Sequence, residues 1–170
     1  MKGKRIIAAI GISSLLWLTA CDSISNINAP DLSGNIELSG TVSCGTLKAE
    51  ADISRNDGVW KITCTAPDSI NGMEIVTDGT QRKITHSGIV FDYKTEDVPF
   101  ISAFDYIIAA IDSTAQKDSF SLSQSGTETR LSGTVLSSGY ILTVDSKGDI
   151  VSLSAGGYNF TAVKDDKKEG

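Results

Sequence analysis

The sequence is short of the residue types that most enzyme active sites require. Its 170 residues include a single histidine, His86, and no Gly-x-Ser-x-Gly segment that would present a hydrolase serine. The glycine-rich loop that cradles phosphate groups is missing as well. His86 stands beside Ser87-Gly88, a turn signal at which an exposed histidine needs no special role. We therefore expect neither a catalytic residue nor a cofactor.

Metal-binding side chains are equally scarce. Zinc ligands normally come in pairs at short spacings, whereas Cys21, Cys44 and Cys64 are far apart and only one histidine accompanies them. The segment "DSKGD" at 145–149 lacks the spacing of oxygen ligands that a calcium loop needs. We expect no metal site.

Positive charge is in short supply too. The chain has 15 Lys and Arg against 21 Asp and Glu, which gives a net charge of −6. Residues 1–20 carry three positive charges and no acid, so the net charge without them is −9. Nucleic acids and anionic lipid head groups are bound by clustered Lys and Arg. The acidic balance therefore predicts no nucleic-acid partner and no electrostatic attachment to a membrane.

The N-terminal segment has no apolar run long enough to cross a bilayer, which takes about 20 residues. Its apolar stretch at 6–18 follows a basic start with Lys2, Lys4 and Arg5 and precedes a small-residue site. This order is typical of a secretory signal peptide, which we expect over residues 1–20.

The four residues Leu18-Thr19-Ala20-Cys21 resemble the lipobox of bacterial lipoproteins. The resemblance implies cleavage between Ala20 and Cys21, diacylglycerol on the Cys21 thiol and acylation of the new N terminus, for example by palmitate. Two acyl chains hold a protein firmly, because each buried methylene contributes about 0.8 kcal/mol. We thus expect a lipoprotein on the bacterial cell membrane, anchored through Cys21 and facing outside the cytoplasm. The alternative is a chance cysteine in an ordinary signal peptide or anchor helix.

The rest of the chain has the organisation of one domain. Residues 21–34 are polar and contain Pro30, which predicts a lipidated cysteine followed by a flexible tether. Residues 35–163 form the domain, and residues 164–170, "KDDKKEG", form a charged, solvated tail. The 150 residues from Cys21 onward are enough for one domain with a core.

Apolar–polar alternation predicts a series of strands in the domain. In 36–42, 47–53 and 60–64, apolar residues occupy every second position and polar residues most of the positions between. Turn signals such as "RNDG" and Asp78-Gly79 separate the stretches. Strands with one apolar and one polar face build a half-buried antiparallel sheet.

One segment breaks this rhythm. Between 99 and 113, apolar residues recur at steps of four, three, one and three, which describes one helical face. Pro99 suits the first helical turn, and Glu96 and Asp97 stand near its positive end. The pattern predicts one amphipathic helix over 99–113, in a mainly β, α+β fold.

Cys44 and Cys64 are the pair that an exported protein could join. If Asn56-Asp57-Gly58 forms a turn, Cys64 lies opposite about residue 50, six strand residues or roughly 20 Å from Cys44. A disulfide needs Cα atoms within about 7 Å. We expect free thiols, although a register error or a bend in the strands would permit the bridge.

The order of elements over about residues 35–163 resembles the LolA/LolB-like lipoprotein fold. The likeness is carried by "VWKITCTAPDSINGMEIVTDGTQRKI", "IVFDYKTEDVPFISAFDYIIAAI" and "YILTVDSKGDIVSLSAGGYNFTAV", which match a strand ending in proline, a helix over the sheet and a late hairpin. The resemblance implies a sheet curved into a half-open barrel, whose covered concave side holds acyl chains in several members. Family members usually have a helix before the first strand, which "SISNINAPDLSG" does not favour. No binding residue of the family can be carried over.

A cavity is also expected from the residues themselves. One helix cannot cover a wide sheet, so large side chains or a ligand must fill the apolar face. The alternative is that the same residues are simply the core. The candidate lining residues are Trp60, Ile62, Met73, Ile75, Phe91, Tyr93, Phe100, Phe104, Ile107, Ile108 and Ile111.

These observations favour a non-enzymatic, membrane-anchored lipoprotein that binds an apolar ligand such as a lipid acyl chain. A second hypothesis is an interaction or sensor module that meets an envelope protein, since Ser and Thr are frequent on the polar strand faces. An enzyme is the third hypothesis, which loss of a measured activity in His86→Ala would support.

Overall fold

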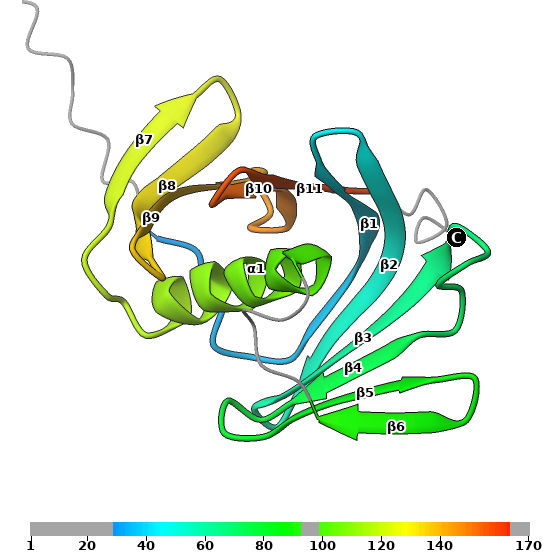
Figure 1. The fold of residues 1–170 in the computed structure, drawn as a ribbon. Helices are drawn as coiled ribbons and strands as arrows, with labels where there is room; N and C mark the ends of the chain where they lie inside the picture. Colours follow the sequence, from blue (N-terminus) through cyan, green and yellow to red (C-terminus); the bar gives the residue numbers. More distant parts are fainter. Residues whose placement is uncertain (1–28, 93–98, 164–170) are drawn as a thin grey trace, which may run out of the picture.

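The computed structural model describes residues 29–92 and 99–163. Within these residues, one antiparallel sheet of eleven strands surrounds a single helix, α1 (Pro99–Ala115) (Figure 1). The strands are β1 (Ile36–Cys44), β2 (Leu47–Asn56), β3 (Val59–Ala66), β4 (Glu74–Thr77), β5 (Arg82–His86), β6 (Ile89–Asp92), β7 (Ser121–Ser125), β8 (Glu128–Val135), β9 (Ser138–Val144), β10 (Ile150–Ala155) and β11 (Tyr158–Ala162).

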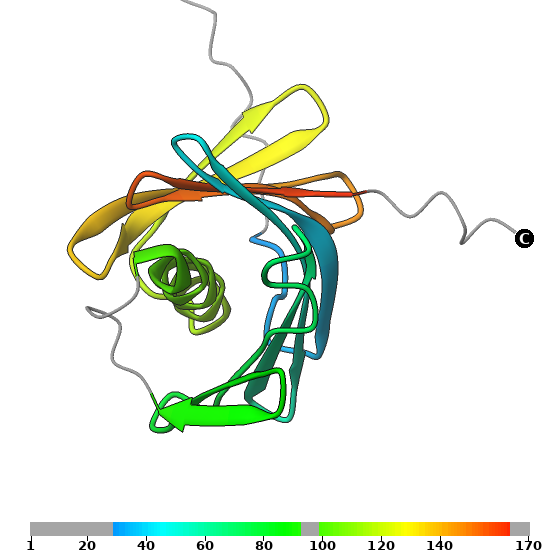
Figure 2. The same cartoon turned by 45° about the vertical axis from the view of Figure 1, so that its right-hand side comes forward.

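The sheet consists of two meanders joined side by side. Its strand order is β6-β5-β4-β3-β2-β1-β11-β10-β9-β8-β7. β1 pairs with β11 in antiparallel register, with Gly40 opposite Ala162 and Val42 opposite Phe160. β6 and β7 are the two edges, and the sheet curves around α1 without closing (Figure 2). The predicted fold class, a curved antiparallel sheet with one covering helix, is confirmed.

Glycine permits close packing where β1 and β11 meet at the centre of the sheet. A Cβ on Gly40 would lie 2.6 Å from the Phe160 ring and closer still to the carbonyl oxygen of Thr161. The Phe160 ring is buried in the core. The absence of a side chain at Gly40 therefore lets an aromatic ring pack over the neighbouring strand.

The helix lies on the concave side of the curved sheet (Figure 2). Every side chain from Ile101 to Ala115 is buried or partly buried. α1 contacts β1 and four strands of the second meander, β8 to β11 (Figures 1 and 2). The predicted helix over 99–113 is confirmed and extends two residues further. No helix in the described residues is both long and apolar enough to span a bilayer.

The turn in "RNDG" sets the register of β2 and β3. Asp57 and Gly58 have φ angles of 51° and 80° and form a two-residue hairpin loop, as the sequence predicts. The register places Cys64 opposite Ala51, one residue from the expected partner, while Cys44 ends β1. Both cysteines are free thiols and Cys64 is buried, which confirms the prediction of no disulfide between them.

Part of the predicted tether lies against the domain. Leu32 is buried in the core, and its carbonyl oxygen accepts a hydrogen bond from the Arg55 guanidinium. The Gly34 carbonyl accepts two more from the same side chain, 3.3 Å from Nε and 2.6 Å from Nη2. The expected signal peptide, Cys21 and the charged tail at 164–170 lie outside the described residues.

Candidate functional site: a cleft between the helix and the sheet

A cleft of about 210 Å³ opens beside α1 on the concave side of the sheet. Its other walls come from three hairpins, β2–β3, β4–β5 and β8–β9. The lining residues are Gly58, Trp60, Thr77, Asp78, Gly79, Arg82, Asp105, Ile108, Ala109, Asp112 and Leu136.

One face of α1 supplies the acidic wall. Asp105, Ile108 and Asp112 stand at positions i, i+3 and i+7, a spacing that places them on the same side of a helix. Asp105 and Asp112 are the two acids in the sequence of α1. Ala109 lies beside them in the lining, and its small side chain leaves room in the cleft.

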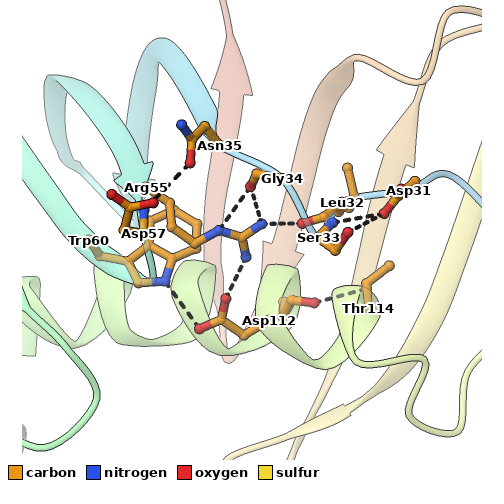
Figure 3. A network of polar contacts seen from close by, with 11 residues as sticks. Asp31, Leu32, Ser33, Gly34, Asn35, Arg55, Asp57, Trp60, Asp112 and Thr114 are labelled. Carbon is orange, nitrogen blue, oxygen red and sulfur yellow. Dashed lines mark hydrogen bonds and ion pairs between the residues drawn. The ribbon is translucent and has the colours of Figure 1, made fainter.

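Asp112 joins the helix to β2 and β3 (Figure 3). Its Oδ1 accepts a hydrogen bond from Nη1 of Arg55 at 2.8 Å, and its Oδ2 accepts one from Nε1 of Trp60 at 3.1 Å. The Arg55 guanidinium carbon also lies 5.2 Å from the centre of the Trp60 ring, within cation–π range. Because Arg55 also binds the carbonyls of Leu32 and Gly34, this network fixes one wall of the cleft.

A second ion pair crosses the cleft lining. Nη1 of Arg82 on β5 lies 3.0 Å from Oδ2 of Asp105 on α1. The Asp105 side chain is 3% exposed and the Arg82 side chain 33%, so the acid is deep and the base is near solvent. This pair ties the first meander to the helix on the side where α1 makes few strand contacts.

Asp78 supplies a carboxylate between β4 and β5. Its Oδ1 accepts hydrogen bonds from the N–H and hydroxyl of Thr80, at 2.8 and 2.7 Å, and from the N–H of Gln81 at 2.8 Å. These bonds, that from Gln81 foremost, lower the pKa of Asp78 to about 2. The carboxylate is therefore ionised at neutral pH.

The cleft also has an apolar side, to which Trp60, Ile108 and Leu136 contribute. Leu136 is 53% exposed at the loop between β8 and β9. Leu136 and Ser137 have φ angles of 48° and 63°, in the left-handed region that Asn and Gly adopt more easily. A leucine held in this conformation beside a cleft is a candidate for ligand contact.

The residues predicted to line a cavity divide between the cleft and the core. Trp60 and Ile108 line the cleft, although Trp60 is only 2% exposed and also belongs to the buried core. Those in the buried core alone are Ile62, Met73, Ile75, Phe104, Ile107 and Ile111. Only the backbone is described for Phe91, in β6, and for Phe100, in α1, while Tyr93 lies outside the described residues.

The polar lining was missed by reasoning from sequence. From the sequence, Asp78-Gly79 predicts only a turn. The turn is present in the structure, and it also places Asp78 in the cleft lining. Asp105 and Asp112 carry a usable signal, because they are two acids seven residues apart in an otherwise uncharged helix. Arg82 and Leu136 carry none, since only the tertiary fold brings their hairpins together.

His86 lies apart from this lining, at the end of β5. Its Nδ1 is buried and has no hydrogen-bond partner in the described part of the chain. Across residues 29–92 and 99–163, no group of three or more His, Cys, Asp or Glu is arranged to hold a metal ion. The cleft is therefore the candidate site.

No protein-family model matches the sequence, and no curated protein is similar to it in sequence. Among the solved structures that are similar in part are two of low sequence identity. A chain from the complex of the CwlD amidase from Clostridioides difficile with the GerS lipoprotein is 11% identical, with a TM-score of 0.49 over 80% of this chain and 85% of that one. A LolA superfamily protein from Nitrosomonas europaea is 11% identical, with a TM-score of 0.36 over 74% of this chain and 64% of that one. Likenesses this remote assign no function, so the cleft has to be interpreted from its own residues.

Proposed function

We propose that this chain is a lipid-anchored, non-enzymatic domain of the bacterial envelope, of LolA-like fold, that binds an apolar group in the cleft beside α1. The observation that carries the proposal is the position of Trp60. Its side chain is contributed by β3 and lines the cleft together with Ile108, Ala109 and Leu136. These side chains give the cleft an apolar wall of the kind that ligand pockets usually have.

The size of the cleft limits what it can enclose. Pockets for drug-sized ligands measure about 300–1,000 Å³, and this cleft measures about 210 Å³. The remaining concave face is filled by fully buried side chains such as Phe104, Ile62 and Leu142. The ligand is therefore expected to insert one end, such as the end of an acyl chain, and to leave the rest outside.

Native mass spectrometry tests ligand binding. The form to use lacks residues 1–20, carries Cys21→Ser and is extracted gently from its host. We expect an added mass that organic solvent removes and that lipid analysis identifies. A bare mass, together with no uptake of a fluorescent fatty acid, would refute apolar-ligand binding.

Membrane attachment is supported by Leu18-Thr19-Ala20-Cys21 and is tested separately. The full chain extracted from membranes is expected to have the mass of residues 21–170 plus diacylglycerol and an acyl group. Cys21→Ser should abolish the added mass and release the protein from the membrane fraction. A wild-type chain that keeps residues 1–20 and gains no lipid would contradict the anchor.

The strand β6, an edge of the sheet among the described residues, favours a second candidate function, a module that binds an extended segment of an envelope protein. Ile89 and Val90 on this strand are 65% and 56% exposed, and an edge strand offers unpaired backbone groups to a partner strand. A photo-crosslinking residue at Val90 should trap one defined partner in the cell. The same residue at Ser123, on the opposite edge strand β7, is the control and should trap none.

A further inference from the structure

The polar lining of the cleft has an excess of negative charge. Asp78, Asp105 and Asp112 line it, and Arg82 is the one Lys or Arg in the lining among residues 29–92 and 99–163. Three carboxylates against one guanidinium leave a formal charge of −2. Arg55 compensates part of this charge by pairing with Asp112, although it does not line the cleft. The chain as a whole has a net charge of −6, so its field also attracts cations.

Two of these carboxylates keep the capacity to accept further hydrogen bonds. An ionised carboxylate offers about four acceptor positions. Asp112 uses one oxygen for Arg55 and the other for Trp60, and its side chain is 34% exposed. The hydrogen bonds to Asp78 from Thr80 and Gln81 all use Oδ1. Both acids can therefore accept from a donor in the cleft.

The apolar residues of the lining indicate that the ligand has an apolar part next to this donor group. Trp60, Ile108, Ala109 and Leu136 share the lining with the acids, so a cation without an apolar part would leave them uncovered. The volume of about 210 Å³ corresponds to roughly seven water-sized groups. A short alkyl stem with a small polar head matches this volume.

We propose that the cleft binds a primary ammonium group carried on a short apolar stem. The ammonium lies at Asp78 and Asp112, and the stem lies along Trp60 and Leu136. This inference rests on the proposed function, because it takes the cleft to be the ligand site, and it adds the chemical class of the ligand.

An aminated lipid head group is the source that the placement favours. If Cys21 carries the lipid, eight Cα–Cα steps separate it from Ala29, a span of at most roughly 29 Å. Ala29 begins the segment whose Leu32 and Gly34 carbonyls bind Arg55, the residue that also pairs with an acid of the cleft. The lipid anchor would thus hold the cleft within reach of the membrane surface.

Trp60 makes the test direct, because it lines the cleft. The chain has two tryptophans, so the full chain with Trp17→Phe has Trp60 as its only indole. This protein is titrated at neutral pH with n-hexylamine, n-hexanol and hexanoate, which share a stem length and differ in the head group. We expect the Trp60 fluorescence to report at least tenfold tighter binding of n-hexylamine than of n-hexanol, with hexanoate weakest.

Two substitutions remove the acids one at a time. Asp112→Asn and Asp78→Asn should each reduce the preference for n-hexylamine over n-hexanol at least threefold. Asp78→Asn should keep the turn between β4 and β5, because the amide oxygen of the asparagine still accepts hydrogen bonds from Thr80. It therefore still tests the proposal if Asp112→Asn fails to fold. The matched control is Asp52→Asn, since Asp52 bonds to Ser39 and is not part of the cleft lining; it should leave the preference unchanged.

The outcomes separate this inference from the function on which it rests. Equal binding of n-hexylamine and n-hexanol would overturn the ammonium site and leave apolar binding intact. No fluorescence change with any probe would overturn both. A preference that survives in both Asp→Asn variants would also overturn the assignment to these carboxylates.

A second titration distinguishes the sources of the ammonium. Phosphatidylglycerol vesicles with and without phosphatidylethanolamine are compared with Nα-acetyl-lysine methylamide. A response that requires phosphatidylethanolamine supports the lipid head group. A response to the lysine compound alone would overturn that source in favour of a protein side chain.

Discussion

Nη1 of Arg55 on β2 and Oδ1 of Asp112 on α1 lie 2.8 Å apart, with the arginine side chain 8% exposed. The same guanidinium binds the carbonyls of Leu32 and Gly34, so one buried side chain connects the sheet, the helix and the segment before β1. Asp112 also accepts the indole N–H of Trp60. Arg55 therefore holds both the cleft wall and the end of the predicted tether in place.

Replacement of this arginine should destabilise the fold. Arg55→Met leaves two carbonyl oxygens and Oδ1 of Asp112 without the donor that Arg55 supplies, and we expect a loss of about 2–3 kcal/mol in the free energy of unfolding. Urea denaturation measures the change. The control is Lys61→Met, which breaks the exposed pair between Lys61 and Glu74 and should change stability by less than about 1 kcal/mol. Equal effects of the two substitutions would contradict the role of the buried network.

The pairing of β1 with β11 should not tolerate a side chain at position 40. Gly40→Ala would place a Cβ 2.6 Å from the Phe160 ring, which is held in the core. We expect a loss of about 2–3 kcal/mol, measured by thermal denaturation. Gly139→Ala is the matched control, because its nearest atom would be 3.9 Å away, and it should be nearly neutral. A neutral Gly40→Ala would show that the strands separate easily here.

Burial of the Cys64 thiol should make stability depend on pH in the alkaline range. Burial raises the pKa of Cys64 from 9.0 to about 11. The unfolded chain releases this proton above pH 9 while the folded chain retains it, so stability is full below pH 9 and is lost as the pH rises through about 11. The expected loss is about 2–3 kcal/mol. Lys and Tyr titrate in the same range, so the free energy of unfolding is measured against pH for both wild type and Cys64→Ala. The wild type should lose stability more steeply, and parallel slopes would refute the prediction.

The loop between β8 and β9 should trade stability against binding. Leu136→Asn with Ser137→Gly gives residues that adopt positive φ easily, and we expect a gain of about 1 kcal/mol in stability. The same change removes an apolar residue from the cleft lining, so binding of n-hexanol should weaken. Chemical denaturation and Trp60 fluorescence in the Trp17→Phe background measure the two effects. A gain in stability without weaker binding would remove Leu136 from the site.

The sequence predicts those parts of the fold that depend on local pattern. The alternation in β1 to β3, the turn at Asp57-Gly58 and the amphipathic helix all follow from side chains within a few residues of each other. Alternation alone did not identify every exposed residue, since Leu47 and Ile89 are 58% and 65% exposed near strand ends and edges. The burial of Leu32 has no local signal, because the residue is covered only in the folded domain.

The cleft was beyond prediction for a related reason. It is assembled from residues as distant as Gly58, Asp78 and Leu136, each of which looks like an ordinary loop residue in its own hairpin. Their proximity depends on the curvature of the sheet and on the pairing of β1 with β11. Alternating strands resemble one another, so that pairing cannot be selected from the sequence.

The place of β11 in the sheet determines when this protein can complete its fold. β1 pairs locally with β2, but its second partner, β11, lies more than a hundred residues later in the chain, since Gly40 pairs with Ala162. Each meander can form from local hairpins, but the two join only after the late strand β11 has been synthesised, and such distant pairing is slow. If the chain is exported as proposed, this delay leaves the two meanders unjoined during passage through the membrane. The sheet is then joined at its centre on the far side, with α1 already available to pack between its two halves.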